Sequence, residues 1–244
     1  MPSWPWFYLA AGLVVIIALV FSIQTARLIR SQLGDRWQNG PIDPSDALGM
    51  SRRELYANAV LSQALMLALI WIGMVVSGVD MATLGLPGAV DLEIALVLGV
   101  AIGFVLAGLN EVMERSFRWL KVPYDDALRR LLAPSTPGDW ASLGLLVLPT
   151  VAIFEELLFR GVLIGGLEAG LGVSPWVLGL VSSVLFAIGH VLQGLGGLVA
   201  AFLLGLFLAG TFILTESLLV VIIAHYLVNL IEFVRHPPGR SDPL

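Results

Sequence analysis

The sequence contains no cysteine and few charged residues. The absence of cysteine from all 244 positions excludes a disulfide framework, a thiol nucleophile and a thiolate metal site. Charged residues make up 13% of the chain and hydrophobic residues 58%, whereas a soluble domain carries about 25% charged residues. A chain with so little charge cannot cover a surface that faces water. We therefore predict an all-α, polytopic transmembrane helical bundle whose surroundings are the lipid bilayer.

Basic clusters are missing as well. The net charge is −5, and no run of Lys and Arg interleaved with aromatic residues occurs, which argues against a nucleic-acid partner. The first apolar run has no basic segment before it and no small-residue cleavage site, which favours a retained span over a signal peptide.

Long apolar runs dominate what is present. A spanning helix needs about 20 predominantly apolar residues. This rule predicts seven spans, with eight as the alternative because two of the turns between them are very short. The predicted spans lie near residues 7–23, 58–79, 94–112, 142–165, 177–193, 196–215 and 217–234.

The loops between these spans predict the orientation of the chain, because Lys and Arg in short loops remain on the cytoplasmic side of a membrane. Basic residues gather in residues 24–57, in residues 113–140 and after residue 234, and the alternate loops hold none. Seven spans with the N-terminus outside and the C-terminus cytoplasmic place every basic residue but Arg160 on the cytoplasmic side.

Three charged residues, Glu155, Glu156 and Arg160, lie inside an apolar run. An ionisable side chain at this depth costs roughly 3 kcal/mol or more, so it normally faces the protein interior and marks a functional site. Residues four apart share a helix face, whereas adjacent residues lie about 100° apart. We therefore expect Glu156 and Arg160 to form an ion pair and Glu155 to point elsewhere, into a cavity, as the reactive carboxylate.

Two later spans each carry a histidine. Phe186 and His190 share a helix face by the same four-residue spacing, as do His225 and Asn229. Each group alone would be interpreted as a packed core residue or as a hydrogen bond between helices. Together they predict polar groups from three helices that converge on one water-accessible pocket. The polar groups expected at helix ends or in the tail, exposed and outside this pocket, are Glu168, Glu216, Glu232 and His236.

The three spacings resemble the motifs of one family of membrane proteases. Residues 155–160 (EELLFR) resemble an EExxxR motif, residues 186–190 (FAIGH) an FxxxH motif and residues 225–229 (HYLVN) an HxxxN motif. These motifs belong to the CAAX protease and bacteriocin-processing (CPBP, or Abi) family, which includes the Ras-converting type of CAAX endopeptidase. The division of the chain that this resemblance implies is N-terminal transmembrane helices with cytoplasmic loops in 1–139, catalytic helices in 140–234 and a cytoplasmic tail in 235–244.

The resemblance implies an intramembrane endopeptidase that hydrolyses peptide bonds in or near the membrane. It assigns Glu155 as the general base that activates a water molecule and His190 as the residue that orients this water. It assigns His225 with Asn229 as the pair that stabilises the oxyanion. The supporting residues are Glu156, Arg160 and Phe186.

A zinc-dependent mechanism is the alternative for the same site. Glu155, His190 and His225 form a ligand set that binds zinc in soluble metalloproteases, and Glu156 could then serve as the base. The HExxH sequence of those enzymes is absent, and the resemblance to the Ras-converting type implies a glutamate-dependent enzyme without a metal. We therefore favour catalysis without a metal cofactor.

The resemblance further implies an integral protein of the prokaryotic cytoplasmic membrane that acts on a peptide or a membrane protein. Prenylated CAAX tails, peptide pheromones, bacteriocin leaders and membrane-protein segments are all compatible with it, and the residues do not indicate an oligomeric state. The rival interpretation is a non-enzymatic membrane protein that uses the same buried polar groups, such as a transporter, a proton relay, or an inactive scaffold or immunity factor. No inverted repeat or pair of broken helices supports a transporter.

Overall fold

The described part of the chain is helical, as the sequence predicts. The computed structural model describes residues 2–33 and 42–237, and within these ranges it contains no strand. Six helical segments are long and apolar enough to span a membrane, and a further apolar helix is shorter. The six are α1 (Trp4–Leu33), α3 (Arg52–Ser77), α4 (Leu92–Leu120), the segment α6 to α8 (residues 137–171), α10 (Gly194–Thr215) and α11 (Leu218–Arg235), and the shorter helix is α9 (Pro175–Gly189).

Several helices extend beyond the spans that hydropathy predicts. α1 continues to Leu33 and α4 to Leu120, well past the predicted ends at residues 23 and 112. The additional turns carry charged residues such as Arg27 and Arg115, which end an apolar run although the helix itself continues. The remaining elements are short: α2 (Pro44–Leu48), η2 (Ala82–Leu84), α5 (Ala127–Leu132) and η5 (Val191–Gln193). Of the predicted tail, residues 238–244 lie outside the described residues.

Local sequence signals explain where the second spanning helix begins and ends. Ser51 and Glu54 form a capping box at the start of α3, in which each side chain binds the backbone of the other residue. At the other end, Gly78 adopts a left-handed conformation with φ of 70° and donates its N–H to Met74 O. Glycine reaches this conformation without a steric penalty, so the helix stops there.

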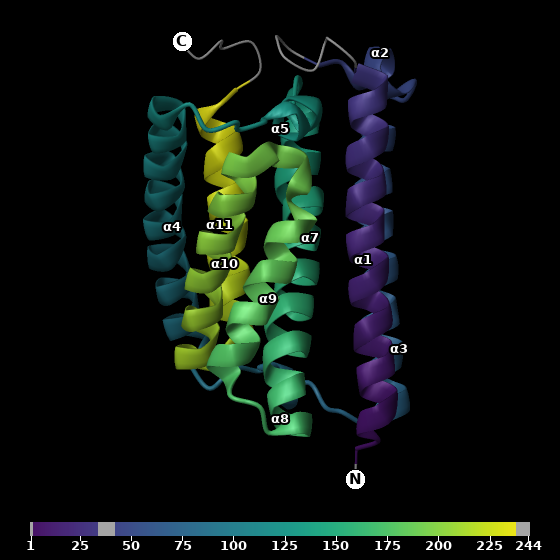
Figure 1. Ribbon diagram of the computed structural model, residues 1–244, viewed down its shortest axis with the longest axis vertical. Helices are drawn as coiled ribbons and strands as arrows, with labels where there is room; N and C mark the ends of the chain where they lie inside the picture. The colour runs from purple at the N-terminus through teal and green to yellow at the C-terminus, as the bar shows by residue number, and fades with distance from the viewer. Residues whose placement is uncertain (1, 34–41, 238–244) are drawn as a thin grey trace.

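The helices run up and down the long axis of the molecule (Figure 1). α1 packs along α3 on one side, whereas α4 packs along α11 and α10 along α9. The segment formed by α6 (Pro137–Ser142), η3 (Leu143–Val147), α7 (Leu148–Glu156), η4 (Leu157–Gly166) and α8 (Leu167–Leu171) lies between these groups and contacts α1, α3, α9, α10 and α11. It is the most buried of the six spanning segments. The charged residues of the predicted site therefore lie on the central helix of the bundle.

Two glycines on α4 allow a close approach to α11. A Cβ atom at Gly99 would lie 2.7 Å from Ile223 Cβ, and one at Gly103 would lie 2.9 Å from Leu227 Cβ. Small residues four apart let two membrane helices pack backbone to backbone, where van der Waals contact replaces the hydrophobic effect. These glycines hold α11, which carries His225 and Asn229, against α4.

We expect Gly103→Val to lower the free energy of unfolding by about 1–3 kcal/mol, because the added methyl groups overpack this contact. Unfolding of purified protein by SDS titration in mixed micelles measures the change. Gly108→Val is the matched control on the same helix, since a Cβ at Gly108 meets no atom within 4 Å. Equal effects of the two substitutions would show that the contact does not limit stability.

Candidate active site

The central segment changes its winding on both sides of the two glutamates. Pro149 has no N–H to donate to the preceding turn, and residues 143–147 just before it form a π-helix. A second π-helix follows the glutamates over residues 157–166. Wide turns of this kind are rare within α-helices and occur frequently at functional sites. They flank the α-helical turn that presents Glu155 and Glu156.

The expected ion pair between Glu156 and Arg160 is present and lies in the centre of the protein. Arg160 Nη1 donates to Glu156 Oε1 at 2.8 Å, and both side chains are 0% exposed. Arg160 Nη2 donates to the backbone oxygen of Gly205 on α10 at 3.1 Å, and the guanidinium carbon lies 4.8 Å from the centre of the Phe186 ring. The pair thus ties the central segment to α9 and α10.

His225 on α11 joins this pair. Its Nδ1 lies 2.5 Å from Glu156 Oε1, and its Nε2 lies 3.5 Å from Glu155 Oε2. The two adjacent glutamates therefore flank one imidazole ring, whereas their angular separation on the helix predicted that Glu155 would point away from Glu156 and its partners. Glu155 still differs in accessibility, because 19% of its side chain is exposed while Glu156 is fully buried.

His190 is joined to the same cluster through Phe186. The Phe186 ring lies 4.4 Å from the His190 ring and 5.9 Å from the His225 ring. His190 Nδ1 lies 2.8 Å from the backbone oxygen of Phe186. A carbonyl can only accept a hydrogen bond, so Nδ1 carries the proton, and Nε2 of a neutral ring is left as an acceptor. No hydrogen bond or ion pair joins His190 to Glu155 among the described residues.

Asn229 lies one turn beyond His225 on α11 and is half-buried. Its side chain makes no hydrogen bond to the described part of the chain. A side-chain amide offers two donors and an acceptor, so Asn229 can bind a substrate without first breaking a protein contact.

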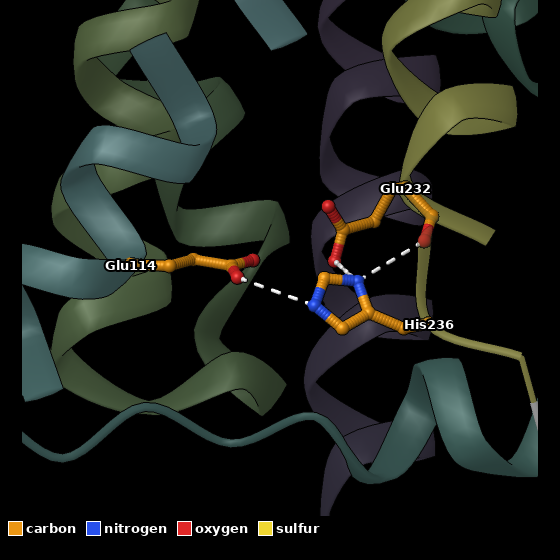
Figure 2. Close-up of side chains that lie close together, drawn as sticks. All are labelled: Glu114, Glu232 and His236. Carbon is orange, nitrogen blue, oxygen red and sulfur yellow. Dashed lines mark hydrogen bonds and ion pairs between the residues drawn. The ribbon is translucent and has the colours of Figure 1, made fainter. Parts of the chain in front are cut away.

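The alternative zinc ligands are not among the groups of described residues whose ligand atoms lie within 4.8 Å of one another. Residues 2–33 and 42–237 contain one group of at least three His, Asp or Glu side chains whose ligand atoms all lie within 4.8 Å of one another. This group consists of Glu114, Glu232 and His236 (Figure 2). The set Glu155, His190 and His225 does not meet this condition, and Glu156 already binds His225 Nδ1.

Two polar residues are more buried than the sequence predicts. His236 and Glu232 were expected to be exposed, but their side chains are only 13% and 18% exposed and contact each other and Glu114. The prolines that follow His236 indicate an exposed tail in the sequence. The signal against this interpretation is the four-residue spacing of Glu232 and His236 at the end of α11, which brings their side chains together. The interaction with Glu114 is long-range and has no local signal.

The fold and this cluster define a class: an integral membrane protein of apolar helices, two of which contribute a buried centre of carboxylate, arginine and histidine. Residues 137–231 match the family model described as type II CAAX prenyl endopeptidase Rce1-like, and this match confirms the family resemblance of the three motifs. The match begins in α6, ends in α11 and contains all four proposed catalytic residues. At the level of the family it indicates a CAAX-protease-like intramembrane endopeptidase. Comparisons with curated proteins and with solved structures gave no significant match.

Proposed function

We propose that this protein hydrolyses peptide bonds with a water molecule activated by Glu155. The observation that carries the proposal is the difference between two adjacent carboxylates that reach the same imidazole. Glu156 is fully buried, and its Oε1 accepts from both Arg160 and His225. Glu155 is partly exposed and has only a 3.5 Å contact with His225. A base must be reached by water and must have a free lone pair, and Glu155 meets both conditions better.

The charges of the cluster support a donor role for His225. With His225 protonated, the charges of Glu155, Glu156, Arg160 and His225 sum to zero, which is the least costly state at this depth. Nδ1–H then donates to Glu156, and Nε2–H is directed toward the open side where Glu155 lies. When Glu155 turns to the water, Nε2–H becomes free to donate to the oxyanion of the tetrahedral intermediate.

His190 and Asn229 complete the proposed mechanism. The Nε2 lone pair of His190 accepts a hydrogen bond from the attacking water and fixes its position. Asn229 donates a second hydrogen bond to the oxyanion, and each donor set in place before the reaction contributes about 3 kcal/mol by analogy with soluble proteases. No step of the proposed mechanism requires a metal ion.

We infer that the end of the bundle that contains α5 faces the cytoplasm. The end of α1, the start of α3, the end of α4 and the end of α11 all lie at this end (Figure 1), and they carry basic residues. Several of these residues make contacts there, such as Arg30 with Leu192 O at 3.3 Å and Arg52 with Leu131 O at 2.9 Å. Positive charge on the cytoplasmic side is the general rule for membrane proteins.

A cleavage assay on protein reconstituted in liposomes tests the proposal. We expect the wild-type protein to cleave members of a library of membrane-anchored peptides, and a metal chelator to leave the rate unchanged. We expect His190→Ala to lower kcat by about 100-fold or more, since the water loses its orienting acceptor. The melting temperature of the variant, measured in parallel, separates loss of catalysis from loss of folding. Full activity of a folded His190→Ala protein would remove the mechanism, and complete inhibition by the chelator would remove its metal-free form.

A further inference from the structure

The turn that carries His190 is a break between two apolar helices. α9 ends at Gly189, η5 follows, and α10 begins at Gly194, whose φ of 74° is one that glycine adopts without a steric penalty. The last carbonyls of a helix have no partner within it, and helix ends fray. In the proposed mechanism His190 holds a water molecule in one position, so this helix end must be fixed by other parts of the protein.

The last turn of α9 determines how the imidazole of His190 is held. The N–H of His190 donates to Ala187 O at 2.9 Å, a bond that spans three residues instead of the four of an α-helix. Phe186 O, which would accept this N–H in an α-helix, instead lies 2.8 Å from His190 Nδ1. The tightened turn thus leaves one carbonyl free to bind the ring. The conformation of the turn and the orientation of the imidazole are therefore linked.

Two side chains of α1 bind the carbonyls on both sides of His190. The hydroxyl of Ser22 donates to Gly189 O, which belongs to the residue directly before the histidine. Arg30 Nη2 donates to the backbone oxygens of residues 191–192, both at 3.3 Å. Residues eight apart lie on one side of a helix, and α1 contacts both α9 and η5 along this side. The turn is therefore held from α1 before and after the histidine.

The bond made by Ser22 is unlike those of most hydroxyls on the spanning helices. Ser62 donates to Ala59 O at 2.9 Å and Thr150 to Leu146 O, both within their own helix, as is usual for serine and threonine in helices. Ser22 instead donates to a different helix. A hydroxyl that bonds across helices in an apolar environment fixes their relative position.

The connection between α4 and α5 holds the end of the same turn. Asp125 N donates to Gln193 O at 2.9 Å, and Gly196 N donates to Pro123 O at 2.8 Å. Each backbone oxygen of residues 189–193 therefore accepts a hydrogen bond, and the side-chain donors come from α1. The turn between α9 and α10 is thus fixed along its whole length by segments that precede the central helix in the chain.

We propose that Ser22 and Arg30 are positioning residues that keep His190 in the orientation in which it binds the attacking water. They act through backbone carbonyls and do not touch the substrate. The inference rests on the role proposed above for His190. It gives α1 a part in the reaction, although α1 lies outside residues 137–231, which match the family model.

Initial rates of peptide cleavage in liposomes test the proposal. We expect Ser22→Ala to lower kcat by roughly 10- to 100-fold, the effect of misplacing a catalytic group by 1 Å or less, and to leave KM unchanged. Arg30→Met should cause a smaller loss of kcat, because Arg30 is exposed. Ser22→Thr retains the hydroxyl and should recover most of the rate. Ser31→Ala is the matched control on α1, since the Ser31 hydroxyl binds Leu28 O of its own helix at 2.8 Å.

A double variant shows whether the loss passes through His190. In the His190→Ala background, Ser22→Ala should cause no further decrease in kcat, because the side chain that it positions is gone. A general loosening of the bundle would instead lower kcat by the same factor in both backgrounds, and that result would overturn the proposal.

Nitrogen NMR of protein labelled in histidine gives a readout that does not depend on cleavage. The chain has three histidines, so the ring signals of His190 are identified by their loss in His190→Ala. We expect the wild type to show one neutral tautomer with the proton on Nδ1, as the contact with Phe186 O requires. Ser22→Ala should show exchange between the two tautomers.

These measurements separate failure of this inference from failure of the proposed function. Full activity of His190→Ala would remove the proposed mechanism, and the ring signals would still show whether α1 orients the histidine. Loss of activity in His190→Ala, with wild-type kcat and ring signals in a folded Ser22→Ala protein, would overturn the positioning role alone. If Ser22→Ala does not fold, Arg30→Met takes its place, and wild-type kcat and ring signals in that variant would overturn the inference.

Discussion

Replacing Arg160 by methionine is expected to lower the free energy of unfolding by about 3–5 kcal/mol, the usual cost of removing one partner of a buried ion pair. Methionine fills much of the same volume, so the loss reports the charge rather than a cavity. The substitution leaves Glu156 fully buried, with Oε2 unpaired and Oε1 held by His225 alone, and it leaves the backbone oxygen of Gly205 without its side-chain donor. SDS titration in mixed micelles, followed by tryptophan fluorescence, measures the change.

Arg115→Met is the matched control for this prediction. Arg115 also pairs with a glutamate four residues away, Glu111, but 70% of its side chain is exposed. Exposed pairs of this geometry contribute little because water and salt screen them. Similar losses in Arg160→Met and Arg115→Met would contradict a special role for the buried pair. The double variant Glu156→Leu with Arg160→Met should recover part of the stability, since no buried charge is then left alone.

The Glu156–Arg160 pair could be predicted from the sequence because it depends only on helix geometry. Two residues four apart on a helix face each other wherever that helix lies. The partners from other helices could not be derived in this way, because nothing local specifies that His225 inserts between Glu155 and Glu156. That these side chains meet was predicted from the presence of polar groups in three apolar helices, and from the order and spacing of three motifs that resemble those of a family.

Hydropathy located the helices but not their ends. It detects the part of a helix that suits lipid, and α1 and α4 continue beyond that part with charged turns. It also misplaced His236, because a histidine followed by two prolines resembles a solvent-exposed tail. The actual surroundings of His236 depend on Glu114, a residue more than 100 positions earlier in the chain. Long-range contacts between polar groups leave no periodic signal in hydropathy.

Glu155→Gln is expected to lower kcat by about 10²–10⁴-fold, the contribution of a general base to a proton transfer. Glutamine has the shape of glutamate and can still accept a hydrogen bond from water, but it cannot take up the proton. KM should change little, because substrate binding does not depend on this proton transfer. Initial rates on a cleaved peptide in liposomes measure both constants, and the melting temperature should stay close to that of the wild type, since Glu155 is partly exposed and not tightly paired.

Glu168→Gln is the control on the same spanning segment, because Glu168 is exposed near its far end and should not affect cleavage. Full activity of Glu155→Gln would remove the proposed role of Glu155 as the base, whereas the absence of any cleavage by the wild-type protein would favour the rival interpretation of a non-enzymatic protein. The neighbouring substitution Glu156→Gln distinguishes the two carboxylates. We expect it to lower stability first, because Arg160 and His225 both lose a charged partner. The opposite result would be loss of cleavage in Glu156→Gln at unchanged stability, together with full activity of Glu155→Gln. The base would then be Glu156, and accessibility to water would not determine which of the two adjacent carboxylates acts as the base.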